Sequence, residues 1–100
     1  MSDQRIKMTP QELNAGAKFL GDRRETIISE VSSLKRKIDE VAAEWEGAAQ
    51  NSFVNQFHEM YPMLSRDLPE IINGIEQMLN AAADAMRETD ASLASAFKGQ

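Results

Sequence analysis

The feature that most constrains this chain is a row of apolar residues that recurs every three to four positions through its first half. With Arg24 as its one polar member, the row consists of Leu13, Ala17, Leu20, Ile27, Val31, Leu34, Ile38, Val41 and Trp45. A seven-residue repeat of this length is typical of helices that pack in bundles and coiled coils. Thr9 and Glu12 match a capping box, and Pro10 suits the first helical position. We therefore predict a first helix over about residues 9–45.

A second helical pattern occupies the other half of the chain. Its apolar positions are Ala49, Phe53, Val54, Phe57, Met60, Tyr61, Leu64, Leu68, Ile71, Ile72, Ile75, Met78, Leu79, Ala82 and Met86. On a helical wheel these positions cover roughly 140°, which is broader than contact with one neighbouring helix requires. We predict a second helix over about residues 48–96 that contacts more than one neighbour.

Two prolines, Pro62 and Pro69, interrupt the second pattern. Proline removes a backbone hydrogen bond and kinks or breaks a helix. On the wheel both prolines point away from the apolar arc, and the apolar phase continues past them. We predict a kink near residues 62–69 that is convex toward solvent. The alternative is a break near Asp67 to Pro69, which would give three helices.

The two patterns meet at the stretch Trp45-Glu46-Gly47. Glycine commonly closes a helix in the left-handed conformation, and antiparallel helices need only a short connection. We predict an all-α fold, with residues 1–100 forming one antiparallel two-helix hairpin that turns at about residues 46–47. Trp45 either covers the end of the groove between the helices or lines a groove that another segment enters.

Composition excludes several classes of function. The chain has 100 residues, a net charge of −5 and no cysteine. A negative charge disfavours nucleic acid and anionic membrane surfaces, and the lack of cysteine removes disulfides and thiolate zinc sites. The opening residues MSDQRIKM lack the apolar core of a signal peptide, and no run approaches a membrane span of ~20 apolar residues. We expect a soluble protein without a Sec signal peptide.

Residues for catalysis are scarce. His58 is the only histidine, and we interpret it as a surface residue because no nucleophile accompanies it in the pattern. The densest acidic group, Asp39, Glu40, Glu44 and Glu46, spreads around a helix end and is interpreted as a solvated face. We expect no enzyme activity, no cofactor and no bound metal.

A Trp-Xaa-Gly motif at the midpoint of a helical chain of this length resembles the WXG family of Esx-type proteins. The opening IKMTPQEL also resembles that of Gram-positive members. The resemblance covers nearly the whole chain. It implies a protein made in the cytoplasm and exported by a type VII secretion system, with a membrane-anchored secretion ATPase as a partner and an association with virulence.

The end of the chain resembles the export signal of that family. Met86, Asp90, Leu93 and Phe97 match its spacing, and Met86 in place of tyrosine is typical of Bacillota-type systems. Geometry gives the same segment a second property. With a rise of ~1.5 Å per residue in both helices, the first helix covers the second only to about Ala83. Residues 84–97 are therefore expected to overhang the hairpin.

The broad apolar arc predicts self-association. We expect an antiparallel homodimer in which two hairpins form a four-helix bundle, with a heterodimer with a second WXG protein as the alternative. Small residues at Ala15, Gly16, Ala17 and Gly21 are expected to allow close crossing at the dimer axis. An intracellular adaptor or dimerisation module is the alternative function. A membrane-active effector is disfavoured because the chain has no basic amphipathic face.

Overall fold

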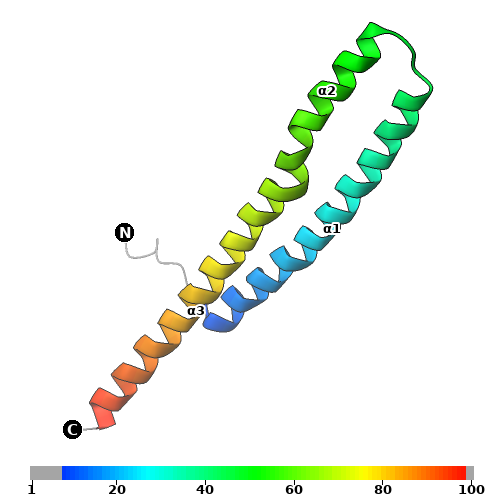
Figure 1. The fold of residues 1–100 in the computed structure, drawn as a ribbon. Helices are drawn as coiled ribbons and strands as arrows, with labels where there is room; N and C mark the ends of the chain where they lie inside the picture. Colours follow the sequence, from blue (N-terminus) through cyan, green and yellow to red (C-terminus); the bar gives the residue numbers. More distant parts are fainter. Residues whose placement is uncertain (1–7, 99–100) are drawn as a thin grey trace, which may run out of the picture.

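The computed structural model describes residues 8–98, and the side chains of residues 8–96. The chain forms α1 (Pro10–Ala43), α2 (Ala48–Pro62), the π-helical segment η2 (Met63–Asp67) and α3 (Leu68–Lys98). The last three elements follow one another without a break and run antiparallel to α1 (Figure 1). The predicted all-α hairpin is confirmed, and the described residues contain no strand.

The first helix begins with the predicted capping box. The Thr9 hydroxyl accepts a hydrogen bond from the Glu12 N–H at 3.1 Å, and the Thr9 N–H donates to Glu12 Oε1 at 2.8 Å. Pro10 is the first helical residue, where no intrahelical partner exists for an N–H. These reciprocal bonds satisfy backbone donors that the first turn leaves unpaired.

The second half of the hairpin passes both prolines as one continuous helix. The widened π turn of η2 lies directly before Pro69, whose ring would clash with the carbonyl four residues earlier in a regular α-helix. Pro69 is buried, so the prediction that it points toward solvent is wrong. The π segment is the reason, because it changes the angular phase of every residue that follows it.

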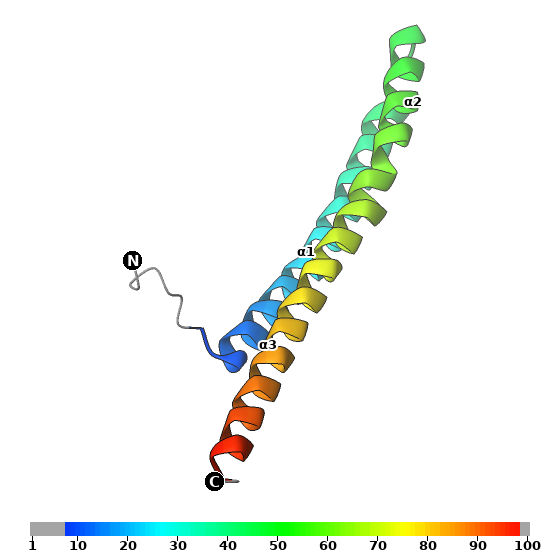
Figure 2. The same ribbon diagram turned by 90° about the vertical axis from the view of Figure 1, so that its left-hand side faces the viewer.

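The hairpin tapers from its turn toward its open end. Figure 1 shows α1 running beside α3 and diverging from α2 near the turn, and Figure 2 shows the helices forming a single layer. Small residues at the open end allow the close approach: Ala17 and Ala83 are buried, and a Cβ built on Gly16 would lie 3.7 Å from Leu79 Cδ1. Aromatic side chains occupy the wider turn end.

The core of a single hairpin is thin. Its buried apolar residues are Ala17, Val31, Ala42, Phe57 and Ala83. The accessible surface is 7802 Å², whereas a compact monomer of 11.2 kDa has about 5,700 Å². The molecule extends 80 × 28 × 17 Å. One layer of two helices cannot enclose the apolar arc that the sequence contains.

Each helix carries a row of exposed apolar side chains on one side of this layer. In these rows each residue immediately precedes a residue that faces the other helix, as Val41 precedes buried Ala42 and Met78 precedes Leu79. Because the two helices are antiparallel, such rows turn toward the same side of the hairpin. We call this the apolar side and define it by the exposed residues Leu34, Val41, Ile71, Ile75 and Met78.

Candidate functional site

The connection between α1 and α2 presents a half-exposed aromatic pair. Trp45 lies just beyond the end of α1, and its ring centroid is 5.7 Å from that of Phe53 on α2. The two residues are 39% and 38% exposed. The Ala42 carbonyl at the end of α1 accepts hydrogen bonds from the Trp45 N–H at 3.2 Å and from Gln50 Nε2 at 2.8 Å. Trp45 therefore joins the helix ends and remains accessible to a partner.

Gly47 begins the second helix instead of closing the first. Its φ of 123° and ψ of 171° lie outside the left-handed helical region that we expected, in a region open essentially only to glycine. The residue is the N-cap of α2, while Glu44 caps α1. The requirement for glycine follows from the reversal of the chain, which occurs immediately before α2.

Further aromatic contacts extend from the turn along α2. The rings of Phe57 and Tyr61 have centroids 5.7 Å apart, and Lys35 Nζ on α1 lies 5.8 Å from the Tyr61 centroid. Lys35 also donates to Asp39 at 2.9 Å, and this hydrogen bond and the carboxylate charge raise the pKa of Lys35 above its ordinary value. His58 is exposed, with its ring centroid 6.4 Å from that of Phe57.

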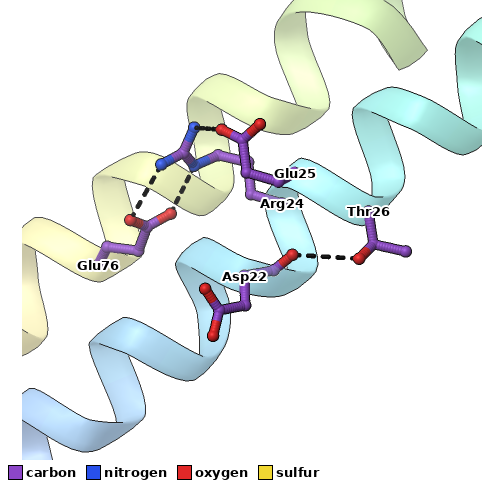
Figure 3. Close-up of polar contacts among 5 residues, drawn as sticks. All are labelled: Asp22, Arg24, Glu25, Thr26 and Glu76. Atoms are coloured by element: carbon purple, nitrogen blue, oxygen red, sulfur yellow. Dashed lines mark hydrogen bonds and ion pairs between the residues drawn. The ribbon is translucent and has the colours of Figure 1, made fainter.

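Arg24, the polar member of the apolar row, pairs with Glu76 across the hairpin (Figure 3). Arg24 Nε donates to Glu76 Oε2 at 2.6 Å and Nη2 donates to Oε1 at 3.3 Å. The side chains are 25% and 13% exposed. The bond to Glu76, followed by the charges of Glu76 and Glu25, raises the pKa of Arg24. Sequence reasoning had identified Arg24 but missed its partner, although Glu76 interrupts the apolar positions of the second helix.

The small residues of α1 make room for α3 within the same chain. A Cβ built on Gly21 would lie 3.1 Å from Glu76 Oε1, so glycine leaves space for this carboxylate. Gly16 and buried Ala17 also lie against α3, whereas Ala15 is exposed. Gly16, Ala17 and Gly21 therefore serve the contact between α1 and α3, and their place at a dimer axis stays a prediction.

The end of α3 continues beyond the start of α1 (Figure 1). At this end of the hairpin, hydrogen bonds link Asn14 to Asn80 at 2.7 Å and Arg87 to Asn14 at 2.6 Å. Ala83 is fully buried, but residues 88–96 are exposed. We call residues 84–97 the tail, of which residues 88–97 lie past the contact between Arg87 and Asn14.

The expected export-signal residues lie on this tail. Met86 is half-buried, Asp90 is exposed and Leu93 is 55% exposed. Phe97 is part of α3, but its side chain lies outside the described side chains. Met86 and Asp90 line one shallow depression together with Ala85 and Thr89. The spacing of these positions places them along one side of the helix.

The acidic group near the turn engages in surface ion pairs. Asp39 pairs with Lys35, and Glu40 lies 3.7 Å from Lys37. The described residues contain no group of side chains suited to hold a metal ion. Within residues 8–98, no helix combines the length and the apolar character needed to cross a membrane.

The thin core, the open apolar side and the projecting tail define a class of small helical-hairpin proteins that act through exposed surfaces. Residues 5–91 match the family model described as "WXG100: Proteins of 100 residues with WXG". This chain therefore belongs to the WXG100 family, and Trp45-Glu46-Gly47 is its name motif.

Named relatives and solved structures agree with this assignment. The type VII secretion system extracellular protein A of Staphylococcus aureus strain USA300 is 36% identical over 92 residues, which cover 92% of this chain and 94% of that protein. The EsxA structure of Geobacillus thermodenitrificans has a TM-score of 0.75 and 25% identity, and covers 91% of this chain and 98% of that one. The secreted protein EsxB of Bacillus anthracis strain Sterne has a TM-score of 0.71 and 29% identity, with 86% and 97% coverage.

Proposed function

We propose that this chain is a substrate and component of a type VII secretion system that acts by protein–protein contacts, without catalysis. The observation that carries the proposal is the tail, on which Met86, Asp90 and Leu93 form one row that leads from the contact between Arg87 and Asn14 past the start of α1. A helix that presents such a row suits a groove on a partner protein. The names of the relatives, which are extracellular proteins of such systems, support the same function.

The partner of the tail is the membrane-anchored ATPase of the secretion system. Leu93 supplies apolar surface and Asp90 supplies a charge that a basic side chain in the groove would pair with. Arg87 donates a hydrogen bond to Asn14, so the hairpin positions the base of the tail. Trp45 and Phe53 at the opposite end offer a second contact surface.

Export is tested by fractionating cultures with and without the gene for the secretion ATPase. We expect the protein in the medium only when the ATPase is present, with a cytoplasmic enzyme measured alongside to exclude lysis. Retention in the cytoplasm of both strains would instead identify an intracellular adaptor. Equal amounts in both media would show a different export route and contradict the proposal.

The assembly that fits the apolar side is an antiparallel homodimer, in which two hairpins form a four-helix bundle. The accessible surface exceeds that of a compact monomer by about 2,100 Å². Stable interfaces remove about 1,200–2,000 Å² in total from solvent. Leu34, Ile71 and Met78 are 47%, 61% and 69% exposed, and a second copy would cover them with the same kind of surface.

Light scattering on the purified protein at micromolar concentration measures the assembly. We expect about twice the chain mass of 11.2 kDa. A monomer that forms a complex only when mixed with a second WXG protein would identify a heterodimer. A monomer under both conditions would contradict the assignment of the apolar side as an interface.

A further inference from the structure

The contact between α1 and α3 is mainly a repeating row of apolar residues. The ion pair between Arg24 and Glu76 places two charges within it. Arg24 interrupts the apolar row of α1, Glu76 interrupts that of α3, and the pair is bidentate. Rows that repeat every seven residues can pack in more than one register, because a shift by seven positions returns apolar residues to apolar neighbours. A polar residue at such a position restricts the choice, because it needs its own partner.

The structure identifies what each charge would meet after a shift of seven residues. Arg24 would face the residues seven positions from Glu76, which are Pro69 and Ala83, and both are buried. Glu76 would face the residues seven positions from Arg24, which are Ala17 at 4% and Val31 at 9% exposure. In either direction each charge loses its partner and lies against buried apolar groups, which is strongly unfavourable.

Gly21 adds a steric requirement to the same register. The space that a Cβ at Gly21 would fill is occupied by the Glu76 carboxylate, with Oε1 3.1 Å from the Cβ position. The space at Gly21 therefore fixes the position of the Glu76 carboxylate by shape, and the Arg24 guanidinium fixes it by charge. Asn14, which bonds both Asn80 and Arg87, is a second polar contact in this register.

The connection between α1 and α2 is short, but it does not prevent α1 from sliding along α3. Trp45 and Glu46 lie outside any helix, and α1 and α2 diverge toward the turn (Figure 1). Residues near the end of α1 can therefore leave the helix at the cost of few contacts to α2, chiefly the hydrogen bond from Gln50 to the Ala42 carbonyl and the burial of Ala42. The close packing that depends on register lies between α1 and α3.

From these contacts we infer that Arg24 and Glu76 are positioning residues that select the register of the hairpin and thereby set how far the export tail projects. A shift by seven residues would move the tail by about 10 Å relative to α1. It would also separate Arg87 from Asn14. The effect on export rests on the proposed function, whereas the effect on register does not.

The register is measured by electron spin resonance distances between two labels. The chain has no cysteine, so Lys18→Cys and Glu59→Cys create unique sites, and both positions are exposed. Residue 16 faces residue 79, so these sites are separated mainly along the hairpin axis and a shift changes their distance by about 10 Å. Labelled chains are diluted in excess unlabelled protein so that only distances within one chain are recorded.

The decisive variant is Arg24→Leu/Glu76→Leu. We expect it to keep its helicity and melting temperature, because an apolar pair replaces an ion pair, but to show a second distance shifted by about 10 Å. Arg24→Glu/Glu76→Arg should restore one distance. Arg24→Leu alone should lower Tm by about 10 °C, because Glu76 is left unpaired. Lys37→Ala/Glu40→Ala removes an exposed ion pair within α1 and should keep one distance.

A single wild-type distance in the Arg24→Leu/Glu76→Leu variant would show that the connection alone sets the register, and would overturn the inference. Export of the same variants is measured separately in cells. If the doubly substituted variant has two registers but is exported like wild type, the positioning role for the tail is wrong. If wild type itself is not exported, the proposed function fails while the distance result still stands.

Discussion

Trp45 and Phe53 pack against each other across the turn in a tilted arrangement, with ring centroids 5.7 Å apart and ring planes at 43°. Each ring keeps more than a third of its surface exposed. A tryptophan that merely closed the hairpin would be more deeply covered within one chain. The pair therefore favours the interpretation in which Trp45 lines a surface that another segment contacts.

Replacing Trp45 by alanine tests this interpretation. Because the ring is only partly buried, we expect a loss of about 1–2 kcal/mol in the free energy of unfolding, below the ~3–5 kcal/mol of a buried tryptophan. The secreted fraction should fall sharply. Melting and secretion are measured in one strain, with Trp45→Phe as the matched control that keeps an aromatic ring on Phe53. Normal export of Trp45→Ala would leave Trp45 with a structural role alone.

The backbone at Gly47 predicts opposite effects for the same substitution at two glycines. Gly47→Ala should destabilise the protein by about 1–3 kcal/mol, because φ of 123° disfavours any side chain. Gly74→Ala should stabilise it by about 0.5–1 kcal/mol, because Gly74 is inside α3. No atom lies within 4 Å of a Cβ at either position, so crowding does not enter the comparison. Equal effects in thermal melts would remove the argument from backbone strain.

A charge on the apolar side should prevent self-association. We expect Met78→Glu to convert the homodimer to a monomer at micromolar concentration, because Met78 is 69% exposed and would be buried in the bundle. Gln77→Glu is the matched control, since it adds a carboxylate at the adjacent exposed residue. Sedimentation velocity reports both masses. Dimerisation of Met78→Glu with wild-type affinity would place the interface elsewhere.

The projecting tail predicts that export and folding can be separated. Asp90→Ala and Phe97→Ala should change the free energy of unfolding by no more than about 0.5 kcal/mol, because both positions lie on α3 past its contact with Asn14, yet should cut secretion sharply. Glu88→Ala removes a carboxylate from the same exposed segment and should be exported normally. Immunoblots of cells and medium measure export, and thermal melts measure folding. Normal secretion of both tail variants would show that the tail is only an exposed helix end.

The features that sequence reasoning predicted depend on local chemistry. The capping box at Thr9 involves residues three positions apart, and the heptad row implies a helix that needs a neighbour. The sequence likewise predicted the chain reversal beside Gly47, because few residues other than glycine adopt its φ. Counting residues in two helices of equal rise predicted an overhang from residue 84, whereas Arg87 still bonds Asn14 and α3 projects only after this contact.

What only the tertiary structure decided is the angular phase and register of one helix against the other. The π segment at Met63–Asp67 rotates the residues after it, and so Pro69 is buried although a regular wheel placed it toward solvent. The same phase brings Glu76 to Arg24 and Gly21, and it leaves the apolar side open. Sequence periodicity determines that an apolar face exists. It does not determine which residues meet, because a row that repeats every seven residues fits its neighbour equally well when shifted by seven. Only a charge or a change of helical pitch makes one of these registers different from the others.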